Sequence, residues 1–233
     1  MISNVNSSSY TARQMHTTQQ SMQKFQQQIA SGKKINKAGD NAAGLAISEK
    51  LLKEANSLKA YSNNFASELD KNKIADGAFS NIGDTYSDMY ANSIRAMNGI
   101  MSESDRNDLA MANDALNKTV DRIASTTKYN ENFVTADFKS NINTLDASAI
   151  SSQMNSVNAK RSEYGARSNG LEHAINVNNI AAENETAALS RIQDTEMEKA
   201  ISGYKNQQTL NNFQNMMQRN QMSNAEGLAG RLL

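Results

Sequence analysis

The 233-residue sequence contains no cysteine and no proline. Without cysteine the chain can have neither a disulfide framework nor a cysteine-based metal site or nucleophile. About 5% of residues are proline in an average protein, so roughly a dozen would be expected in a chain of this length. Because proline breaks helix interiors, its absence favours long, uninterrupted helices.

Apolar residues are also scarce: they make up 38% of the chain, and aromatic residues make up 6%. Such a composition cannot fill a thick core, but it suits the thin seams between paired helices. The 24 basic and 24 acidic residues balance, which gives no reason to expect a nucleic-acid or membrane partner. No apolar run approaches the ~20 residues that span a membrane, and the first residues lack the apolar segment of a secretory signal peptide.

The two ends of the chain are alike and differ from the middle. Residues 1–31 have two charged side chains and residues 201–233 have four. Each end instead has an apolar stripe at helical spacing; the stripes are Met15, Met22, Phe25 and Ile29, and Met197, Ile201, Tyr204, Leu210, Phe213 and Met217. A narrow stripe buries too little area to offset the ordering of its backbone, which costs about 1–2 kcal/mol per residue. We therefore predict that both ends are disordered in the free monomer and become helical against partners.

The middle of the chain has helical periodicity. Apolar residues recur at spacings of three and four between residues 41 and 97, and the turn SESD at 102–105 predicts the start of a second helix. β-Branched and aromatic residues between 129 and 145 predict a short hairpin, and a third helix is expected from about residue 146 to 192. The fold class we predict is mainly α: a long antiparallel helical bundle or coiled coil with one short β-hairpin.

The stretch SGKKINKAGDNAAGLAI, residues 31–47, concentrates glycine, charge and helix-capping residues at one early position. Gly32 can supply the left-handed residue that closes a helix running in from the N-terminus. Either Asp40 or Asn41 can cap the next helix. The stretch is therefore interpreted as a hinge between two helices.

This stretch resembles the N-terminal signature of bacterial flagellins, which is usually close to SG-[K/R]-R-I-N-x-A-x-D-[D/N]-A-A-G-x-A-I. Residues 159–200 are similar to the C-terminal flagellin core, and TKYNEN at 127–132 resembles the element before the flagellin hairpin. In the C-terminal stretch the matching positions hold Gly165, Ala166, Asn169, Leu171, Glu172, Asn184, Ala187, Ser190, Arg191, Ile192 and Asp194. These matches cover nearly the whole chain in the family's order.

The resemblance implies a minimal flagellin without the variable outer domains. Residues 1–40 would form an inner-tube arm and spoke, residues 41–197 an outer helical domain with a small hairpin near 130–145, and residues 198–233 the second inner-tube arm. The spoke residues would be Gly32, Ile35, Asn36, Asp40, Asn41 and Gly44. The subunit-packing residues would be Met15, Met22, Phe25, Ile29, Ile201, Tyr204, Leu210, Phe213 and Met217, and the polar contacts Arg161, Gly165, Asn169, Arg191 and Asp194.

The function that the resemblance implies is a structural subunit that self-polymerises into the extracellular flagellar filament. Its partners would be copies of itself, the type III export apparatus, an export chaperone and a filament cap. The alternatives are a hook–filament junction protein and a secreted homologue that no longer polymerises. No catalytic signature is visible, and His16 and His173 are interpreted as ordinary solvated or packed residues. We therefore expect no enzymatic activity, no metal and no cofactor.

The sequence departs from the family in two segments. ASELDKNKI at 66–74 replaces the usual N-D-G patch, which leaves open a minor or specialised filament subunit. In SDMYANSIR at 87–95, Asp88, Tyr90 and Asn92 stand where arginine, arginine and leucine are usual in the segment that the flagellin-sensing Toll-like receptor reads. The second departure predicts weak or no recognition by that receptor.

Overall fold

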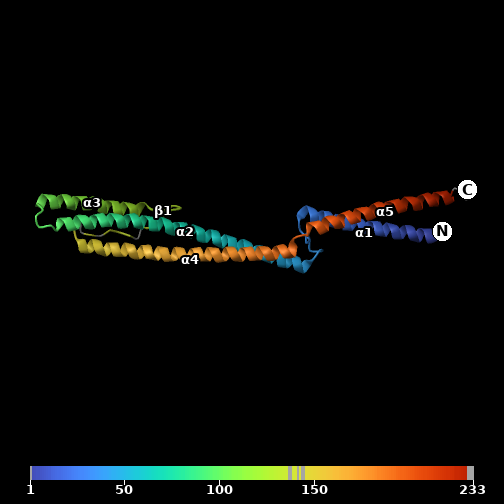
Figure 1. Cartoon of the computed structure of the whole chain (residues 1–233), viewed down its shortest axis with the longest axis horizontal. Helices are drawn as coiled ribbons and strands as arrows, with labels where there is room; N and C mark the ends of the chain where they lie inside the picture. The colour runs from blue at the N-terminus through green and yellow to red at the C-terminus, as the bar shows by residue number, and fades with distance from the viewer. Residues whose placement is uncertain (1, 136–137, 141, 143–144, 230–233) are drawn as a thin grey trace. The chain divides into compact units, whose positions relative to one another are not determined.

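The computed structural model describes residues 2–135, 138–140, 142 and 145–229. In chain order the elements are α1 (Ile2–Ser31), α2 (Ala42–Ala96), α3 (Glu103–Thr126), β1 (Lys128–Tyr129), β2 (Asn132–Phe133), α4 (Ala147–Gln193) and α5 (Met197–Ala229) (Figure 1). The chain divides into two compact units. The first combines residues 1–55 with residues 183–233, and the second contains residues 56–182.

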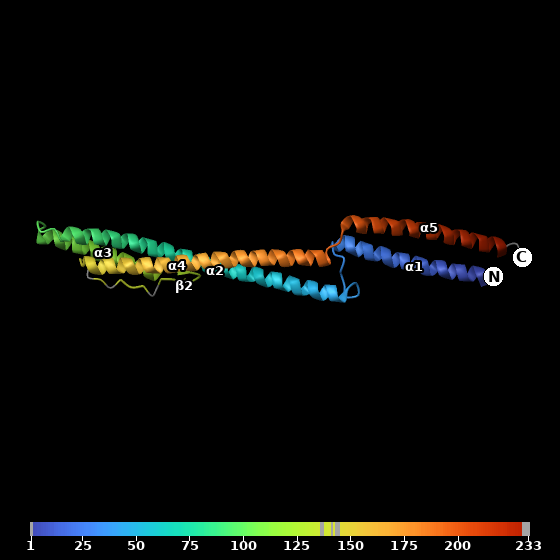
Figure 2. The same ribbon diagram turned by 60° about the horizontal axis from the view of Figure 1, so that its bottom comes forward.

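In the first unit, α1 and α5 lie side by side, as both views show (Figures 1 and 2). Gln26 of α1 is hydrogen-bonded to Tyr204, whereas the earlier Thr18 is hydrogen-bonded to the later Gln214. Since the residue number falls along α5 as it rises along α1, the two helices are antiparallel. The two ends of the chain therefore form one helical pair.

In the second unit, α2, α3 and α4 bury a shared core. Its fully or nearly fully buried members are Phe79, Ile82, Tyr86, Met89, Val120, Ala124, Ile150 and Val157. Phe138, which follows the hairpin, packs against this core with its ring 5.5 Å from that of Phe79 in an edge-on arrangement. Burial raises the pKa of the Tyr86 hydroxyl, because the charged phenolate is poorly solvated in such a core.

The helix bounds agree closely with the sequence prediction. The helix expected over residues 41–97 is α2, and the helix expected from 146 to 192 is α4. Helix α3 begins with a capping box: Ser102 accepts the Asp105 N–H, and Asp105 accepts the Ser102 N–H in return. These boundaries were predictable because capping and periodicity are properties of neighbouring residues.

The hairpin is shorter than predicted and lies earlier. Its strands have two residues each, with Lys128 opposite Phe133 and Tyr129 opposite Asn132. Asn130 and Glu131 join them with φ angles of 47° and 67°, as the two-residue loop of a type I′ hairpin requires. Of the predicted hairpin region, described residues after Phe133 form no strand, and residues 136–137, 141 and 143–144 lie outside the described residues. Packing of Phe138 into the core outweighs the β propensity of this segment.

The structure also changes the interpretation of the chain ends. We predicted that each end orders only against partners, but α1 and α5 are helices that contact each other within one chain. Each of the two terminal helices therefore packs against the other within the same chain. Disorder of both ends in the monomer in solution stays a prediction.

Three polar positions interrupt the apolar stripe of α2. The Ser62 hydroxyl donates to Asn179 Oδ1 at 2.9 Å, and Asp76 Oδ1 accepts from Arg161 Nε at 3.0 Å. Both contacts join α2 to α4. Asn72 is buried, and its Nδ2 has no hydrogen-bond partner among the described residues. Two of the three polar positions therefore connect helices through hydrogen bonds where an apolar side chain could only pack.

Candidate functional site

The connections that enter and leave the α1–α5 pair run alongside each other. The Lys34 N–H donates to the Gln193 carbonyl at 2.7 Å, and the Thr195 N–H donates to the Gly32 carbonyl at 2.8 Å. Lys33 and Asp194 form an isolated antiparallel bridge between these bonds. Gly32 has a φ of 69°, the left-handed conformation that ends α1 and that glycine adopts without strain. We call residues 32–41 the spoke.

Asp40 closes the turn within the spoke. Its Oδ2 accepts the backbone N–H of Asn36 at 3.1 Å and that of Lys37 at 3.3 Å, and its Oδ1 lies 3.6 Å from Lys24 Nζ on α1. The hydrogen bond from the Asn36 backbone, followed by that from Lys37 and the nearby Lys24 ammonium, lowers the pKa of the Asp40 carboxyl below its ordinary value. A charged carboxylate is thus built into the turn that leaves α1.

Asn41 is the residue that caps α2. Its Oδ1 accepts the Gly44 N–H at 2.9 Å, which settles the choice that the sequence left open between Asp40 and Asn41. Gly44 is buried, and a Cβ built there would lie 2.7 Å from Asn41 Nδ2 and 2.8 Å from the Cδ1 of Ile35. Ile35 itself is 4% exposed. The capping amide and the Ile35 side chain therefore meet over Gly44, and a larger residue there would force one of them to shift.

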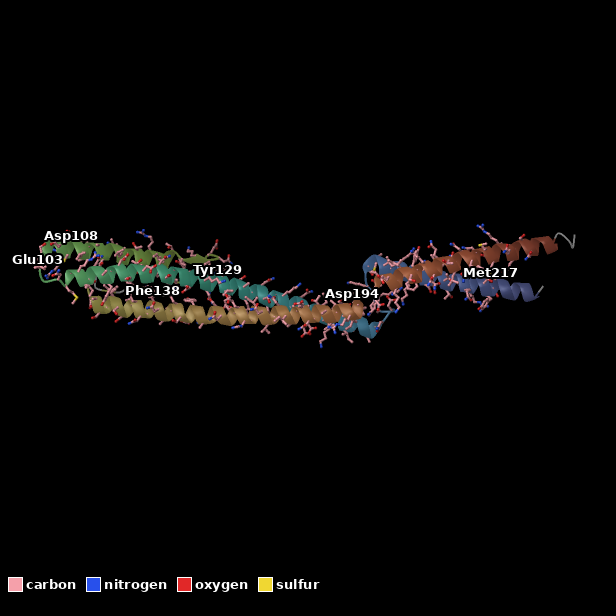
Figure 3. All side chains as sticks on the ribbon, viewed as in Figure 1. Glu103, Asp108, Tyr129, Phe138, Asp194 and Met217 are labelled. Carbon is pink, nitrogen blue, oxygen red and sulfur yellow. The ribbon has the colours of Figure 1, made fainter. Side chains whose placement is uncertain are left out.

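Two of the predicted C-terminal residues lie beside the spoke. The Lys34 ammonium donates to the Arg191 carbonyl at 2.8 Å, and the Ser190 hydroxyl donates to Asp194 Oδ2. Asp194 is labelled in Figure 3. The structure thus places residues 32–34, at the start of the spoke, beside residues 191–195, although about 160 residues separate the two segments in the sequence. The Arg191 contact is made by its backbone, and its side chain is exposed.

The seam between α1 and α5 has the spacing of a coiled coil. Among the buried and half-buried positions of α1 is a series in steps of four and three: Thr11, Met15, Thr18, Met22, Phe25 and Ile29. On α5 the corresponding positions are Ala200, Tyr204, Gln207, Asn211, Gln214 and Gln218. The α5 side of this seam is therefore mostly polar or small. A coiled coil with so many amides in its seam gains less from burial than one lined by leucine.

The apolar residues of α5 lie largely outside that seam. Leu210 is 46% exposed, Phe213 59%, Met216 64% and Met217 41%. Met217 is labelled on α5 in Figure 3. Their spacing of three, three and one places them on one side of the helix, which we call the outer stripe. Of the residues predicted to pack between subunits, Ile201, Leu210, Phe213 and Met217 are exposed in the chain. Met15, Met22, Phe25, Ile29 and Tyr204 are instead half-buried along the α1–α5 seam.

The remaining predicted residues lie in the second unit. Arg161 has an intramolecular partner in Asp76, with both side chains 41% exposed. Gly165 and Asn169 are exposed on α4. In the segment predicted to be read by the receptor, Asp88 and Tyr90 are exposed, whereas Asn92 donates from Nδ2 to the buried Asn113 Oδ1 at 3.0 Å.

Sequence reasoning missed three residues of the seam. Gln214 and Thr18 form a buried hydrogen bond of 3.1 Å between α5 and α1. Gly203 lies under the Phe25 ring, where an added Cβ would be 2.6 Å from Phe25 Cζ. The signal that could have revealed Thr18 and Gln214 is the alternating spacing of three and four through threonine and glutamine, which a search for apolar residues alone overlooks. No local signal indicates the contact of Gly203 with Phe25.

Two general features of the described residues bear on function. None of the described helices combines the length and hydropathy needed to cross a membrane. Within the same residues, no group of three or more histidine, aspartate and glutamate side chains is arranged to hold a metal ion. The site described above is thus a hinge and a helical pair with an exposed apolar stripe, a geometry suited to association.

Comparison of the sequence with known proteins assigns the chain to a family. The model of the bacterial flagellin N-terminal helical region matches residues 2–140. The flagellar filament 33 kDa core protein of Treponema phagedenis is 28% identical, and flagellin FlaB2 of Treponema pallidum is 30% identical; each alignment covers 90% of this chain and 92% of the relative. A flagellin of Halalkalibacterium halodurans is 29% identical over 81% of this chain and 84% of its own length. With a family match over more than half of its residues and relatives that align along most of its length, this protein belongs to the bacterial flagellin family.

Proposed function

We propose that this chain is the structural subunit of a bacterial flagellar filament and acts by polymerising with copies of itself. The relatives that align along most of its length are named flagellins or flagellar filament core proteins. The observation that carries the proposal is the arrangement of the arms. The buried residues of the α1–α5 seam are Thr11, Thr18, Ala200 and Gln214, and its larger apolar side chains are half-buried. The outer stripe of Leu210, Phe213, Met216 and Met217 stays exposed.

This arrangement favours association because exposed apolar surface gains free energy when it is covered, about 25 cal/mol per Å² buried. A repeated head-to-tail contact that does not close on itself generates an open helical filament. The balanced charge of 24 basic and 24 acidic residues avoids strong repulsion between copies. Each of these properties suits a subunit that meets many identical neighbours.

The wider set of partners follows from the same proposal. The chain would be delivered by the type III export apparatus with an export chaperone, added beneath a filament cap and placed in the extracellular filament. Its role would be structural, without enzymatic activity, cofactor or metal. The exposed Asp88 and Tyr90, and the engagement of Asn92 with Asn113, support weak or no recognition by the flagellin-sensing Toll-like receptor.

Seeded growth tests the filament proposal. Purified monomer is salted out in the presence of short sheared filaments, and products are measured by negative-stain electron microscopy. We expect the seeds to lengthen into tubes of uniform width. Monomer that remains soluble but binds the tips of hooks would instead favour a hook–filament junction protein. Monomer that does neither would favour a homologue that no longer polymerises.

Paired variants test the observation that carries the proposal. The double substitution Leu210→Ser with Phe213→Ser makes the outer stripe polar, and we expect it to slow seed elongation by at least about tenfold. The matched control replaces the exposed polar residues Gln208 and Asn212 of the same helix with serine, which changes helix propensity without removing apolar surface. Equal elongation by the two double variants would exclude the outer stripe as an assembly surface.

A further inference from the structure

Two of the four residues of the outer stripe are methionines. Met216 is 64% exposed and Met217 41% exposed, whereas Met89 in the core of the second unit is 0% exposed. The chain contains twelve methionines and no cysteine. Methionine thioethers are therefore the only sulfur atoms in the chain that an oxidant can modify, and exposure selects among them.

Oxidation of a methionine changes the polarity of its side chain. A peroxide transfers one oxygen atom to the thioether sulfur, giving methionine sulfoxide, and is itself reduced to water or an alcohol. The sulfur supplies the electron pair for the new sulfur–oxygen bond, and the peroxide oxygen–oxygen bond breaks. The product is a polar side chain with a strong hydrogen-bond acceptor, which is costly to place in a dry apolar contact.

We propose that Met216 and Met217 are oxidation sites that control self-assembly. Oxidation by a peroxide places two polar groups on the outer stripe and weakens the association of copies. Enzymatic reduction of the sulfoxides by a dithiol, which becomes a disulfide while the oxygen leaves as water, restores it. The inference rests on the proposed filament function, because it needs a second copy of this chain to cover the stripe.

The positions of the two methionines separate assembly from folding. The seam positions of α5, which include Gly203, Tyr204 and Gln214, are buried or half-buried, whereas both methionines are exposed. Exposed side chains at positions 216 and 217 already contact water, so a sulfoxide there leaves the helical pair intact. Oxidation therefore acts on contacts between copies and spares the monomer.

Assembly in turn protects the two sulfur atoms. In the monomer both side chains are open to a dissolved peroxide. In a filament whose subunits cover the outer stripe, the same side chains are shielded. The two methionines are thus reactive before incorporation and resistant after it.

The experiment treats purified full-length monomer with hydrogen peroxide and maps the sulfoxides by peptide mass spectrometry. Seed elongation and far-ultraviolet circular dichroism are measured on the same samples. We expect sulfoxides at Met216 and Met217, and also at other exposed methionines such as Met97, Met111 and Met222. Helicity should be unchanged, and the critical concentration for elongation should rise about tenfold. Treatment with methionine sulfoxide reductases should return the critical concentration to its starting value.

A matched pair of variants assigns the effect to these positions. Met216→Leu with Met217→Leu keeps the stripe apolar and removes both sulfur atoms, so this variant should keep elongating after peroxide treatment. Met97→Leu with Met111→Leu removes two methionines of the second unit that are 72% and 65% exposed. This control should stay as sensitive to peroxide as the unchanged chain. Equal sensitivity of the two variants would overturn the proposal.

Oxidation of assembled filaments supplies an independent test. Peroxide should form sulfoxides at Met216 and Met217 at least about tenfold more slowly in filaments than in monomer, since burial limits access to the sulfur. Equal rates in the two forms would show that the stripe is not covered and would overturn the proposal. If untreated monomer fails to elongate seeds at all, it is the filament function that fails, so the two failures are distinguishable.

Discussion

Gln214 and Thr18 are 196 residues apart in the sequence and are hydrogen-bonded across the α1–α5 seam, with Gln214 Nε2 donating to Thr18 Oγ1 at 3.1 Å. Their side chains belong to residues that are 8% and 5% exposed. Thr18 Oγ1 in turn donates to the Gln14 carbonyl at 2.9 Å. Gln214 Oε1 is buried and has no hydrogen-bond partner among the described residues. A polar pair in a coiled-coil seam can select one register at a cost in stability, and here the pair joins the two ends of the chain in their antiparallel arrangement.

Replacing Gln214 with leucine should stabilise the α1–α5 pair. The substitution removes a buried oxygen without a partner and adds apolar burial, together worth about 1 kcal/mol, or roughly fivefold slower amide exchange in both helices. Hydrogen exchange followed by mass spectrometry measures this in α1 and α5 peptides. The control Gln208→Leu adds the same side chain at an exposed position and should leave protection unchanged. Faster amide exchange in the Gln214→Leu variant would show that the buried Gln214 side chain does not destabilise the α1–α5 pair.

Replacing Gly203 with alanine should loosen the same pair. The added Cβ would lie 2.6 Å from Phe25 Cζ, and overpacking of this kind costs about 1–3 kcal/mol. Thermal unfolding followed by circular dichroism, with hydrogen exchange to locate the change, measures the effect. Adding Phe25→Leu shortens the opposing side chain and should recover part of the loss.

Gly170 supplies the control for that substitution. It lies in α4, and a Cβ added there would have no atom within 4 Å apart from its own helical neighbourhood. Gly170→Ala should therefore stabilise the chain by about 0.5–1 kcal/mol through helix propensity alone. If both glycine variants were stabilised equally, close packing of Phe25 on Gly203 would be excluded.

The turn closed by Asp40 should depend on acid pH. The folded-state pKa of Asp40 lies below its ordinary value of 3.8. The charged carboxylate therefore stabilises the folded turn fully above pH 3.8, and this stabilisation is lost as the pH falls through the lower folded-state pKa. Nuclear magnetic resonance can follow the amide signals of Asn36 and Lys37 during an acid titration. We expect a midpoint below 3.8.

The variant Asp40→Asn supplies the control for the titration. Its amide oxygen can still accept a backbone N–H, but it carries no proton that titrates in this range. The pH-dependent movement of the Asn36 and Lys37 amide signals should therefore disappear. A wild-type midpoint at or above 3.8, or unchanged titration in the variant, would show that Asp40 does not hold the turn through its charge.

Replacing Asn113 with alanine should destabilise the second unit. Asn113 is 0% exposed; its Nδ2 donates to the Met89 carbonyl at 3.1 Å and to Ser93 Oγ at 3.2 Å, and its Oδ1 accepts from Asn92. The lost hydrogen bonds and the small cavity together cost about 2–4 kcal/mol. Chemical denaturation measures the change. Asn107→Ala, at an exposed position of the same helix, should change stability by less than about 0.5 kcal/mol.

Elements defined by neighbouring residues were predicted well. The periodicity from residue 41 to 97 corresponds to α2 within one residue at each end, and Ser102 is the N-cap of α3. The hairpin was misplaced because β propensity describes a segment in isolation, whereas Phe138 gains more by packing against Phe79 and Tyr86. The local sequence does not specify which distant part of the chain a side chain will pack against.

Of the candidate site, the sequence predicted the parts that depend on neighbouring residues and missed the contacts between distant segments. The spoke residues are close in the sequence, and Gly32, Asn41 and Gly44 have local roles in ending one helix and starting the next. The pairing of Lys34 with Gln193 and of Thr195 with Gly32 joins segments about 160 residues apart, and no local signal specifies it. Local sequence likewise does not specify that Ser62 and Asp76 of α2 are hydrogen-bonded to Asn179 and Arg161 of α4.

The sequence by itself determined the helices, their caps, the hinge and the family, because capping, periodicity and ordered motifs are written in consecutive residues. Only the tertiary structure decided which face of each arm meets the other. Two antiparallel helices touch along a line that repeats every seven residues, and on α5 this line passes through Gln207, Gln214 and Gln218. Leu210, Phe213 and Met217 lie beside that line and stay exposed. The seam glutamines and the exposed apolar residues of α5 both have helical spacing. Which of the two faces α1 therefore depends on contacts that form only when the two ends of the chain meet.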